Sequence, residues 1–326
     1  MKIGIVVSGG DVSGINNFIF QIARLAQADI TLFNGGIPGL LEKNHQEVSL
    51  RDLVDYSISA MPIITSGRTA RKLMRVEYEE IAKKLKSLRI DILIMAGGDG
   101  SLQFLNTLSE FDVNCFGVGM TIDNDVYGSD YTIGFSTACE QIIKEVAKLR
   151  NTGRALPGRV FMVEVLGGYC GELTLQAAIK SNADLALIPE CQIPLANLVT
   201  RIQDKLSQQN SVVILCSEGY TREYSPGFQG AVDTMIKQLE PKIGVRIRKA
   251  IVGFGLRSGE PTCEEIYQGT IMASEVVRCI QSGMRNKAII INSSNKPIPI
   301  DLISITKRLV DTEGHHYKLA MQLKII

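Results

Sequence analysis

The sequence of 326 residues contains no tryptophan, only three histidines and no pair of cysteines in a C-x-x-C pattern. Aromatic residues make up 6% of the chain, too few to predict the stacking platforms that bind single-stranded nucleic acid. The histidines lie away from every candidate catalytic motif, which argues against a hydrolase of the Ser-His-Asp or Cys-His type. The cysteines are odd in number and mostly lie in apolar runs, so we expect buried free thiols rather than disulfides or a zinc site.

Neither sign of charge is in excess. The chain has 35 Lys and Arg against 34 Asp and Glu, a formal net charge of +1, so no global field predicts binding to nucleic acid or to a membrane surface. No apolar run reaches the ~18 residues of a membrane-spanning helix. The start, MKIGIVVSGG, lacks the basic region and long apolar core of a signal peptide. We therefore expect a cytoplasmic protein with neither a nucleic-acid nor a membrane partner.

Short apolar, β-branched runs alternate with amphipathic stretches along the whole chain. This pattern predicts an α/β protein whose mostly parallel sheets are covered by helices on both faces, in about two domains or one large unit. The expected strands are residues 3–7, 30–33, 90–95, 114–118, 159–166, 185–188, 212–216, 250–253 and 288–291. The expected helices include residues 15–27, 77–87, 138–149, 171–181, 197–208 and 270–282. Residues 152–158 (TGRALPG) are the best candidate for a boundary or an exposed loop.

Two glycine-rich loops follow predicted strands. Residues 8–16 join a strand to a helix, and residues 97–101 have the sequence GGDGS. At such junctions backbone N–H groups and the helix dipole favour a bound phosphate, and glycine lets the backbone approach it closely. In the second loop Asp99 can hold Mg²⁺ and Ser101 can cap the following helix. This loop is neither a Walker A sequence nor G-x-G-x-x-G. A tight structural turn is the alternative for both loops.

A third loop, residues 121–125, has the sequence TIDND and also follows a predicted strand. In phosphoryl transfer one carboxylate accepts the proton of the attacking hydroxyl while another manages the metal. The alternative is an Asx-rich loop with helix caps. All three loops fall at the carboxyl ends of predicted strands, where an open α/β sheet binds its ligands, so we expect them to form one phosphate site.

These motifs resemble those of the phosphofructokinase family, in particular the bacterial 6-phosphofructokinases. The chain carries GGDVSGIN at 9–16, GGDGS at 97–101 and TIDND at 121–125, with further similar stretches at 126–138, 163–173, 217–219 and 253–259. The resemblance covers essentially the whole chain and implies two three-layer α/β/α domains with mostly parallel sheets. Residues 1–136 plus 256–305 would form the nucleotide-binding domain. Residues 137–255 plus 306–326 would form the sugar-phosphate-binding domain.

The resemblance also implies an activity, the transfer of a phosphoryl group from Mg-ATP to a hydroxyl of fructose 6-phosphate, which is a step of glycolysis. Asp123 would be the general base, Arg68 and Thr121 further catalytic residues, and Asp99 the Mg²⁺ ligand. The implied contacts of the donor phosphates are Gly10, Arg68, Gly98, Asp99, Gly100 and Ser101. The implied contacts of the sugar phosphate are Thr121, Asp123, Asp125, Arg159, Leu166, Gly167, Glu218, Arg248 and Arg257.

Two of these arginines, Arg159 and Arg248, are implied to reach the sugar's existing phosphate from a neighbouring subunit. A homo-oligomer with shared active sites and closed symmetry is therefore expected, and the resemblance implies a homotetramer.

The chain departs from the family pattern at four positions. Gly168 replaces an arginine of the family's M-G-R motif, and Phe254 replaces a histidine that lies on the sugar phosphate. Phe104 stands where the nucleotide pocket has glycine, and Met120 where ATP users have glycine and pyrophosphate users lysine. Gly100 favours ATP, because the pyrophosphate class carries aspartate there. Three functions stay open: an ATP-dependent kinase, with full or reduced activity, a pyrophosphate-dependent one, and a non-catalytic or regulatory paralogue that binds phosphosugar or nucleotide.

Overall fold

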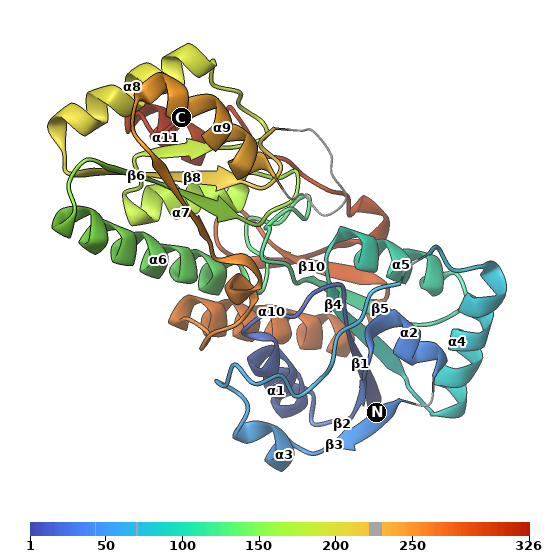
Figure 1. Ribbon diagram of the computed structural model, residues 1–326. Helices are drawn as coiled ribbons and strands as arrows, with labels where there is room; N and C mark the ends of the chain where they lie inside the picture. The colour runs from blue at the N-terminus through green and yellow to red at the C-terminus, as the bar shows by residue number, and fades with distance from the viewer. Residues whose placement is uncertain (43, 70, 222–229) are drawn as a thin grey trace. The chain divides into compact units, whose positions relative to one another are not determined.

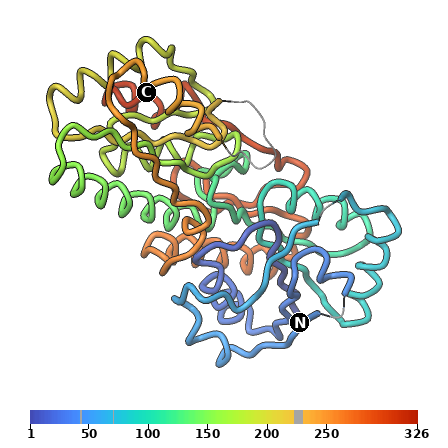
Figure 2. The backbone as a smooth tube through the Cα atoms, in the orientation of Figure 1, coloured from blue at the N-terminus to red at the C-terminus, as the bar shows by residue number. Residues whose placement is uncertain are grey.

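The computed structural model describes residues 1–42, 44–69, 71–221 and 230–326 and divides into two compact units. Unit 1 consists of Met1–Thr137 and Arg257–Arg308, and unit 2 of Ala138–Leu256 and Leu309–Ile326. Within unit 1, Figure 2 shows the orange helix α10 (Cys263–Gln281) beside the blue helix α1 (Ile15–Ala26). The late part of the chain therefore returns to complete the unit that its beginning builds.

Unit 1 is built on a seven-stranded sheet in the order β11-β10-β5-β4-β1-β2-β3. Its strands are β1 (Lys2–Ser8), β2 (Asp29–Phe33), β3 (His45–Val48), β4 (Ile92–Gly97), β5 (Cys115–Gly119), β10 (Lys287–Ile291) and β11 (Pro297–Asp301). The five inner strands pair in parallel, and β3 and β11 close the two edges in antiparallel pairing. The prediction of a mostly parallel sheet is confirmed.

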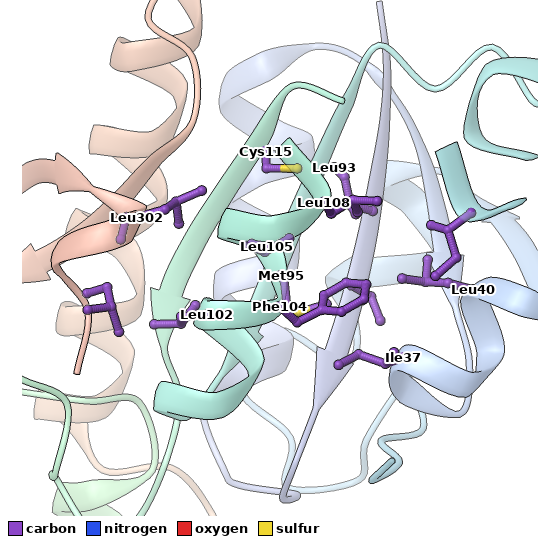
Figure 3. Close-up of a cluster of buried hydrophobic side chains, with 14 of the residues drawn as sticks. Ile37, Leu40, Leu93, Met95, Leu102, Phe104, Leu105, Leu108, Cys115 and Leu302 are labelled. Carbon is purple, nitrogen blue, oxygen red and sulfur yellow. The ribbon is translucent and has the colours of Figure 1, made fainter. Parts of the chain in front are cut away.

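Helices cover both faces of this sheet (Figure 1). They are α1, α2 (Gly36–Leu41), α3 (Leu50–Val54), α4 (Arg75–Ser87), α5 (Asp99–Ser109) and α10. On one face α2, α4 and α5 pack apolar side chains against alternate strand residues such as Leu93 and Met95 (Figure 3). On the other face α1 packs against α3 and α10. Because both faces are buried, every residue of β4, sequence ILIMAG, is buried, which explains its continuous apolar character.

Unit 2 contains a four-stranded, fully parallel sheet in the order β7-β8-β6-β9. Its strands are β6 (Arg159–Val165), β7 (Leu185–Leu187), β8 (Ser211–Ser217) and β9 (Ile247–Ile251). The helices are α6 (Phe135–Ala155), which starts at the end of unit 1, α7 (Glu172–Ser181), α8 (Leu195–Gln208), α9 (Ala231–Ile243) and α11 (His315–Gln322). Helices α8 and α9 bury their apolar stripes on one face of the sheet, and α6 and α7 cover the other (Figure 1).

The structure corrects several expected element boundaries. The strand expected at 250–253 is β9, Ile247–Ile251, and Gly253 instead starts a short 3₁₀ helix, η1 (Gly253–Arg257). Strand β9 lies at the edge of its sheet and contains the polar residues Arg248 and Lys249. It therefore lacks the continuous apolar run by which the other strands were predicted. Residues 152–158 are not a domain boundary, because α6 continues to Ala155 and both flanks belong to unit 2. Residues 156–158, after the helix, form the exposed loop that was the other expectation for this segment. The edge strands β3 and β11 and helix α11 were not predicted.

The expectation of free thiols is confirmed. All seven cysteines are free, and five of them are buried, while Cys191 is partly exposed and Cys263 is exposed. Among the helices that the structure describes, none has the length and apolar character needed to cross a membrane.

A buried carboxylate, Glu265 of α10, holds the amino end of α6. Its two oxygens accept hydrogen bonds from the backbone N–H groups of Gly134 (2.6 Å) and Thr137 (3.2 Å) and from the hydroxyls of Ser136 (3.1 Å) and Thr137 (3.0 Å). Burial raises the pKa of Glu265, and the N–H group of Gly134 acts in the opposite direction. The first N–H groups of a helix have no hydrogen-bond acceptor within the helix. The carboxylate of Glu265 is the acceptor for two such N–H groups at the start of α6.

We expect Glu265→Ala to lower the free energy of unfolding by about 2–4 kcal/mol, because buried donors lose their acceptor. Ser274→Ala, at an exposed position of the same helix, is the control and should cost under about 1 kcal/mol. Urea denaturation of both variants measures the difference. Equal losses in the two variants would show that Glu265 is not what anchors α6.

Candidate active site

The three predicted loops follow three neighbouring strands of unit 1. The sheet order places β5 beside β4 and β4 beside β1, with Ser8 opposite Gly97 and Gly97 opposite Gly119. The loops that leave these residues therefore start side by side at the carboxyl edge of the sheet. The structure thus brings together sequence segments that are about a hundred residues apart.

A pocket of about 340 Å³ lies between these loops. Its lining comes from four loops, together with Ile37 of α2 and Arg257. The loops are the first glycine loop, the GGDGS loop, the TIDND loop and the loop that contains Gly67 and Arg68, which we call the Gly-Arg loop. The lining residues are Ser8, Gly9, Gly10, Ile37, Arg68, Thr69, Gly98, Asp99, Gly100, Ser101, Met120, Thr121, Asp123 and Arg257. All the predicted donor-phosphate residues line this pocket. The roles assigned to these residues stay predictions.

The Gly-Arg loop is tied to the first glycine loop by hydrogen bonds. The Gly9 N–H donates to the Gly67 carbonyl (3.1 Å), and Arg68 Nε donates to the Gly9 carbonyl (2.6 Å). On its other side, the Gly-Arg loop packs against Gly35. A Cβ atom on Gly67 would overlap the carbonyl of Gly35, so only glycine at position 67 allows the two backbones to lie this close. The guanidinium of Arg68 is therefore anchored at the pocket by its own Nε.

A second guanidinium lies against the same loop. A Cβ atom on Gly10 would collide with the terminal nitrogen of Arg257, so the two are in direct contact. Arg257 was predicted as a sugar-phosphate residue, and the structure places it on the pocket beside Gly10 and Arg68. The pocket therefore gathers two arginines at a glycine loop, as an anion site requires.

Helix α5 starts at the pocket with Asp99 as its first residue and Gly98 as its N-cap. The expectation that Ser101 caps this helix is wrong. Its hydroxyl instead donates to the carbonyl of Ser8 (3.2 Å), which ties the GGDGS loop to the first glycine loop. The start of the helix is thereby held toward the pocket by side-chain contacts with β1, and its amides and dipole favour a bound anion there.

The TIDND loop is held by a network of its own. The Met120 N–H donates to the Gly97 carbonyl (2.9 Å), and the Asp123 N–H donates to Thr121 Oγ1 (3.2 Å). Asn124 adopts a left-handed backbone conformation (φ 50°), and its amide donates to the Asp130 carbonyl (3.1 Å). Asn124 is fully buried, whereas Asp123 is half-buried and lines the pocket. The loop therefore presents one carboxylate to the pocket on a backbone that is hydrogen-bonded on both sides.

The predicted sugar-phosphate residues of unit 2 fall at opposite ends of its sheet. Glu218 follows β8, and its Oε1 accepts hydrogen bonds from the N–H groups of Gly167 (3.1 Å) and Gly168 (2.8 Å), which follow β6. Arg159 is instead the first residue of β6, and Arg248 is the second residue of the adjacent strand β9. The structure brings Leu166, Gly167 and Glu218 together, and it does not bring Arg159 or Arg248 to them within one chain.

The family model of phosphofructokinases matches residues 2–280 of the chain. The chain belongs to the phosphofructokinase family. A probable ATP-dependent 6-phosphofructokinase of Mycoplasma pneumoniae is 33% identical over 305 residues, 92% of this chain and 90% of that protein. The ATP-dependent 6-phosphofructokinase of Clostridioides difficile is 30% identical over 330 residues, 99% of both.

Solved structures show the same fold. The phosphofructokinase of Saccharomyces cerevisiae matches with a TM-score of 0.84 and 24% identity over 99% of this chain, which spans 46% of the yeast chain. A pyrophosphate-dependent phosphofructokinase of Marinobacter aquaeolei matches with a TM-score of 0.84 and 16% identity, covering 99% of this chain and 90% of that one. The predicted phosphofructokinase-like α/β fold is therefore confirmed.

In this phosphofructokinase chain a second pocket, of about 690 Å³, adjoins the first. The two pockets share Ile37, Thr69 and Gly100 in their linings. Phe104 forms part of the wall but does not fill the space: it is 6% exposed, stacks on Tyr78 with ring centroids 5.2 Å apart, and points toward Ile37 and Leu40 (Figure 3). The replacement of glycine by Phe104 therefore leaves a pocket next to the phosphate site.

Of the other departures, Gly168 has a left-handed backbone (φ 58°), and Phe254 is 81% exposed in η1. Met120 is buried and lines the first pocket.

An arginine at position 168 would have to adopt the left-handed backbone conformation of Gly168, which L-residues rarely adopt. Glycine at position 168 therefore allows the backbone conformation in which its N–H group donates to Glu218.

The residues at the first pocket fit Mg²⁺ that is held mainly by phosphates. The described residues contain no group of three or more carboxylate, histidine or cysteine side chains that could hold a metal by themselves. Mg²⁺ usually binds one or two carboxylates and completes its shell with water and substrate phosphates, which agrees with Asp99 at the start of α5. Bound there, the ion would neutralise charge on the donor phosphates.

Lys307 was not predicted from the sequence to be part of this site. Its Nζ lies 2.8 Å from Asp125 Oδ2. No motif contains this lysine, and it is far from the TIDND loop in sequence. The structure brings it there because residues 306–308 fold back against the loop.

Proposed function

We propose that the protein is a 6-phosphofructokinase, a transferase that moves the terminal phosphoryl group of Mg-ATP to a hydroxyl of fructose 6-phosphate. The observation that carries this is one pocket that gathers Arg68, Asp99 and Asp123 at the carboxyl edge of the sheet. This arrangement supplies a cation, a metal ligand and a base on separate, anchored loops, as phosphoryl transfer requires. The similarity to the probable ATP-dependent 6-phosphofructokinase of Mycoplasma pneumoniae and to the ATP-dependent 6-phosphofructokinase of Clostridioides difficile supports the same activity.

In the proposed reaction Asp123 accepts the proton of the attacking hydroxyl as its oxygen bonds to the phosphorus of the terminal phosphate. The bond from that phosphorus to the leaving phosphate oxygen breaks, and ADP leaves. Arg68 stabilises the charge on the transferring group, and the amides of Gly10 and Gly100 bind the donor phosphates. Thr121 accepts the Asp123 N–H and so fixes the backbone of the base. Mg²⁺, held by Asp99 and the phosphates, is the proposed cofactor.

The second pocket supports ATP over pyrophosphate as the donor. Pyrophosphate needs only the phosphate site, whereas a nucleoside needs an adjoining space with apolar walls. The second pocket opens at Gly100 and is lined by the rings of Tyr78, Phe104 and Phe111, which suits a base.

The proposed contacts of the sugar phosphate are Thr121, Asp123, Asp125 and Arg257, together with Leu166, Gly167 and Glu218. Arg159 and Arg248 lie at the far end of their sheet from Glu218, which supports their proposed role in a neighbouring subunit's site. We propose a homo-oligomer on the ground of that sharing, and a homotetramer on the ground of the resemblance to the family. The proposed setting for this glycolytic enzyme is the cytoplasm.

The test is turnover of the purified protein with ATP and, separately, with pyrophosphate, each with Mg²⁺ and a panel of sugar monophosphates. We expect turnover with ATP and fructose 6-phosphate, and at least ~10-fold lower kcat/KM with pyrophosphate, the equivalent of about 1.4 kcal/mol. Calorimetry with Mg-ATP provides an independent readout of donor binding. Activity with pyrophosphate without Mg-ATP binding would favour the pyrophosphate enzyme, and binding of both ligands without turnover the non-catalytic paralogue.

A further inference from the structure

A short segment near the end of unit 1, residues 306–308, is docked along the TIDND loop. The Tyr127 N–H donates to the Thr306 carbonyl (2.8 Å), the Arg308 N–H donates to the Asp125 carbonyl (2.8 Å), and Val126 and Lys307 form an antiparallel bridge. Arg308 adds a hydrogen bond from Nε to the Asn124 carbonyl (2.9 Å). We call residues 306–308 the strap. Its backbone is fixed from both sides of Lys307, so the position of this lysine is set by the fold.

The strap delivers an ammonium group to a buried carboxylate. Asp125 is 3% exposed, and Lys307 Nζ lies 2.8 Å from its Oδ2. The lysine side chain stays 42% exposed, so its stem covers the loop while its head reaches inward. A carboxylate this buried is costly to keep ionised without a partner. Lys307 forms a salt bridge with the Asp125 carboxylate and is therefore such a partner.

The charge of Lys307 also acts beyond that pair. Burial lowers the pKa of Lys307, but the hydrogen bond to Asp125 and the charges of Asp125, Asp99 and Asp123 raise it, and the net direction is upward. Asp99 and Asp123 both line the first pocket. The ammonium therefore interacts electrostatically with Asp99 and Asp123 as well as with Asp125.

We propose that Lys307 is a positioning residue of the TIDND loop and the internal counter-ion of the buried carboxylate Asp125. It holds Asp125 against the strap and offsets negative charge that would otherwise repel the donor phosphates. The part of this inference that concerns catalysis rests on the proposed function, whereas the charge compensation concerns the free protein.

The charge of Lys307 has a measurable consequence for anionic ligands. The ammonium favours the approach of phosphates, because it opposes the repulsion from the carboxylates. Removing it should therefore weaken the binding of a metal-free anion such as pyrophosphate and slow turnover. The loss of affinity should be larger at low ionic strength than at high ionic strength, which loss of packing alone does not produce.

The experiment compares Lys307→Met, Lys307→Arg and the control Lys86→Met, which removes an exposed lysine of α4. Binding of metal-free pyrophosphate to the nucleotide-free protein is measured by calorimetry at low and at high ionic strength. At low ionic strength we expect Lys307→Met to bind it ~3- to 10-fold more weakly than the unaltered protein, with Lys307→Arg and Lys86→Met close to it. With ATP and fructose 6-phosphate, Lys307→Met should lower kcat by ~10- to 100-fold, and Lys307→Arg should recover most of that loss.

A stability cycle keeps the test decisive if Lys307→Met folds poorly. Melting temperatures are measured for Lys307→Met, Asp125→Asn and the double variant. We expect Lys307→Met to destabilise strongly when Asp125 is present and only weakly when Asn stands there, because the buried charge is then gone. Additive effects, or pyrophosphate affinity equal in Lys307→Met and the unaltered protein, would overturn the proposal. An unaltered protein without turnover would contradict the proposed function, while pyrophosphate binding and the cycle would still decide the counter-ion.

Discussion

Asp123→Asn is expected to lower kcat by ~10²- to 10⁴-fold while KM for both substrates changes by less than ~5-fold. The asparagine side chain has nearly the same shape, so the hydrogen bond from the backbone N–H of residue 123 to Thr121 Oγ1 should persist. What is lost is the ability to accept a proton from the attacking hydroxyl. Because this loss is felt in the transition state and hardly at all in the bound ground state, it appears in kcat.

Steady-state kinetics of the variant beside Asp204→Asn measures this effect. Asp204 is an exposed acid of α8 in unit 2, and its replacement should leave both constants unchanged. The melting temperature of Asp123→Asn should match that of the unaltered protein, since Asp123 is half-buried. A kcat within a few-fold of the unaltered protein, in a folded variant, would remove Asp123 from the role of base.

The second large effect is expected at Arg68. Arg68→Met should lower kcat by ~10²- to 10³-fold, because a fixed cation at the transferring phosphoryl group stabilises charge that develops in the transition state. Two features of the structure support this magnitude: Arg68 lines the pocket, and its Nε is already bound to the Gly9 carbonyl at 2.6 Å. The guanidinium therefore pays little ordering entropy when the substrate arrives.

Arg68→Lys separates charge from geometry. A lysine keeps the positive charge but cannot both bind the Gly9 carbonyl through Nε and present a planar fork to a phosphate, so we expect only partial recovery. Arg51→Met, an exposed arginine of α3, is the matched control. If Arg68→Met instead raised KM for ATP and left kcat unchanged, the arginine would serve donor binding and not the transition state.

The parallel strands that carry the site were predictable because their signals are local. The strands expected at 3–7, 90–95 and 114–118 are β1 (Lys2–Ser8), β4 (Ile92–Gly97) and β5 (Cys115–Gly119). Each is a continuous apolar run that ends in glycine-rich sequence, which is typical of a strand buried on both faces. The bounds of strand β9 were not predicted, because this edge strand contains Arg248 and Lys249 and has no continuous apolar run.

Sequence alone determined the family, the fold class and the loops that meet at the pocket, since motifs and hydrophobic pattern are properties of short segments. Tertiary structure alone decided which side chains complete the pocket. Arg257 contacts Gly10, Lys307 pairs with Asp125, and Ser101 binds the carbonyl of Ser8 in place of capping its helix. Each of these contacts joins residues far apart in the chain, through segments that return to unit 1 or strands that pair across it. The geometry of that return depends on the packing of the whole unit, so no local pattern at either partner encodes it.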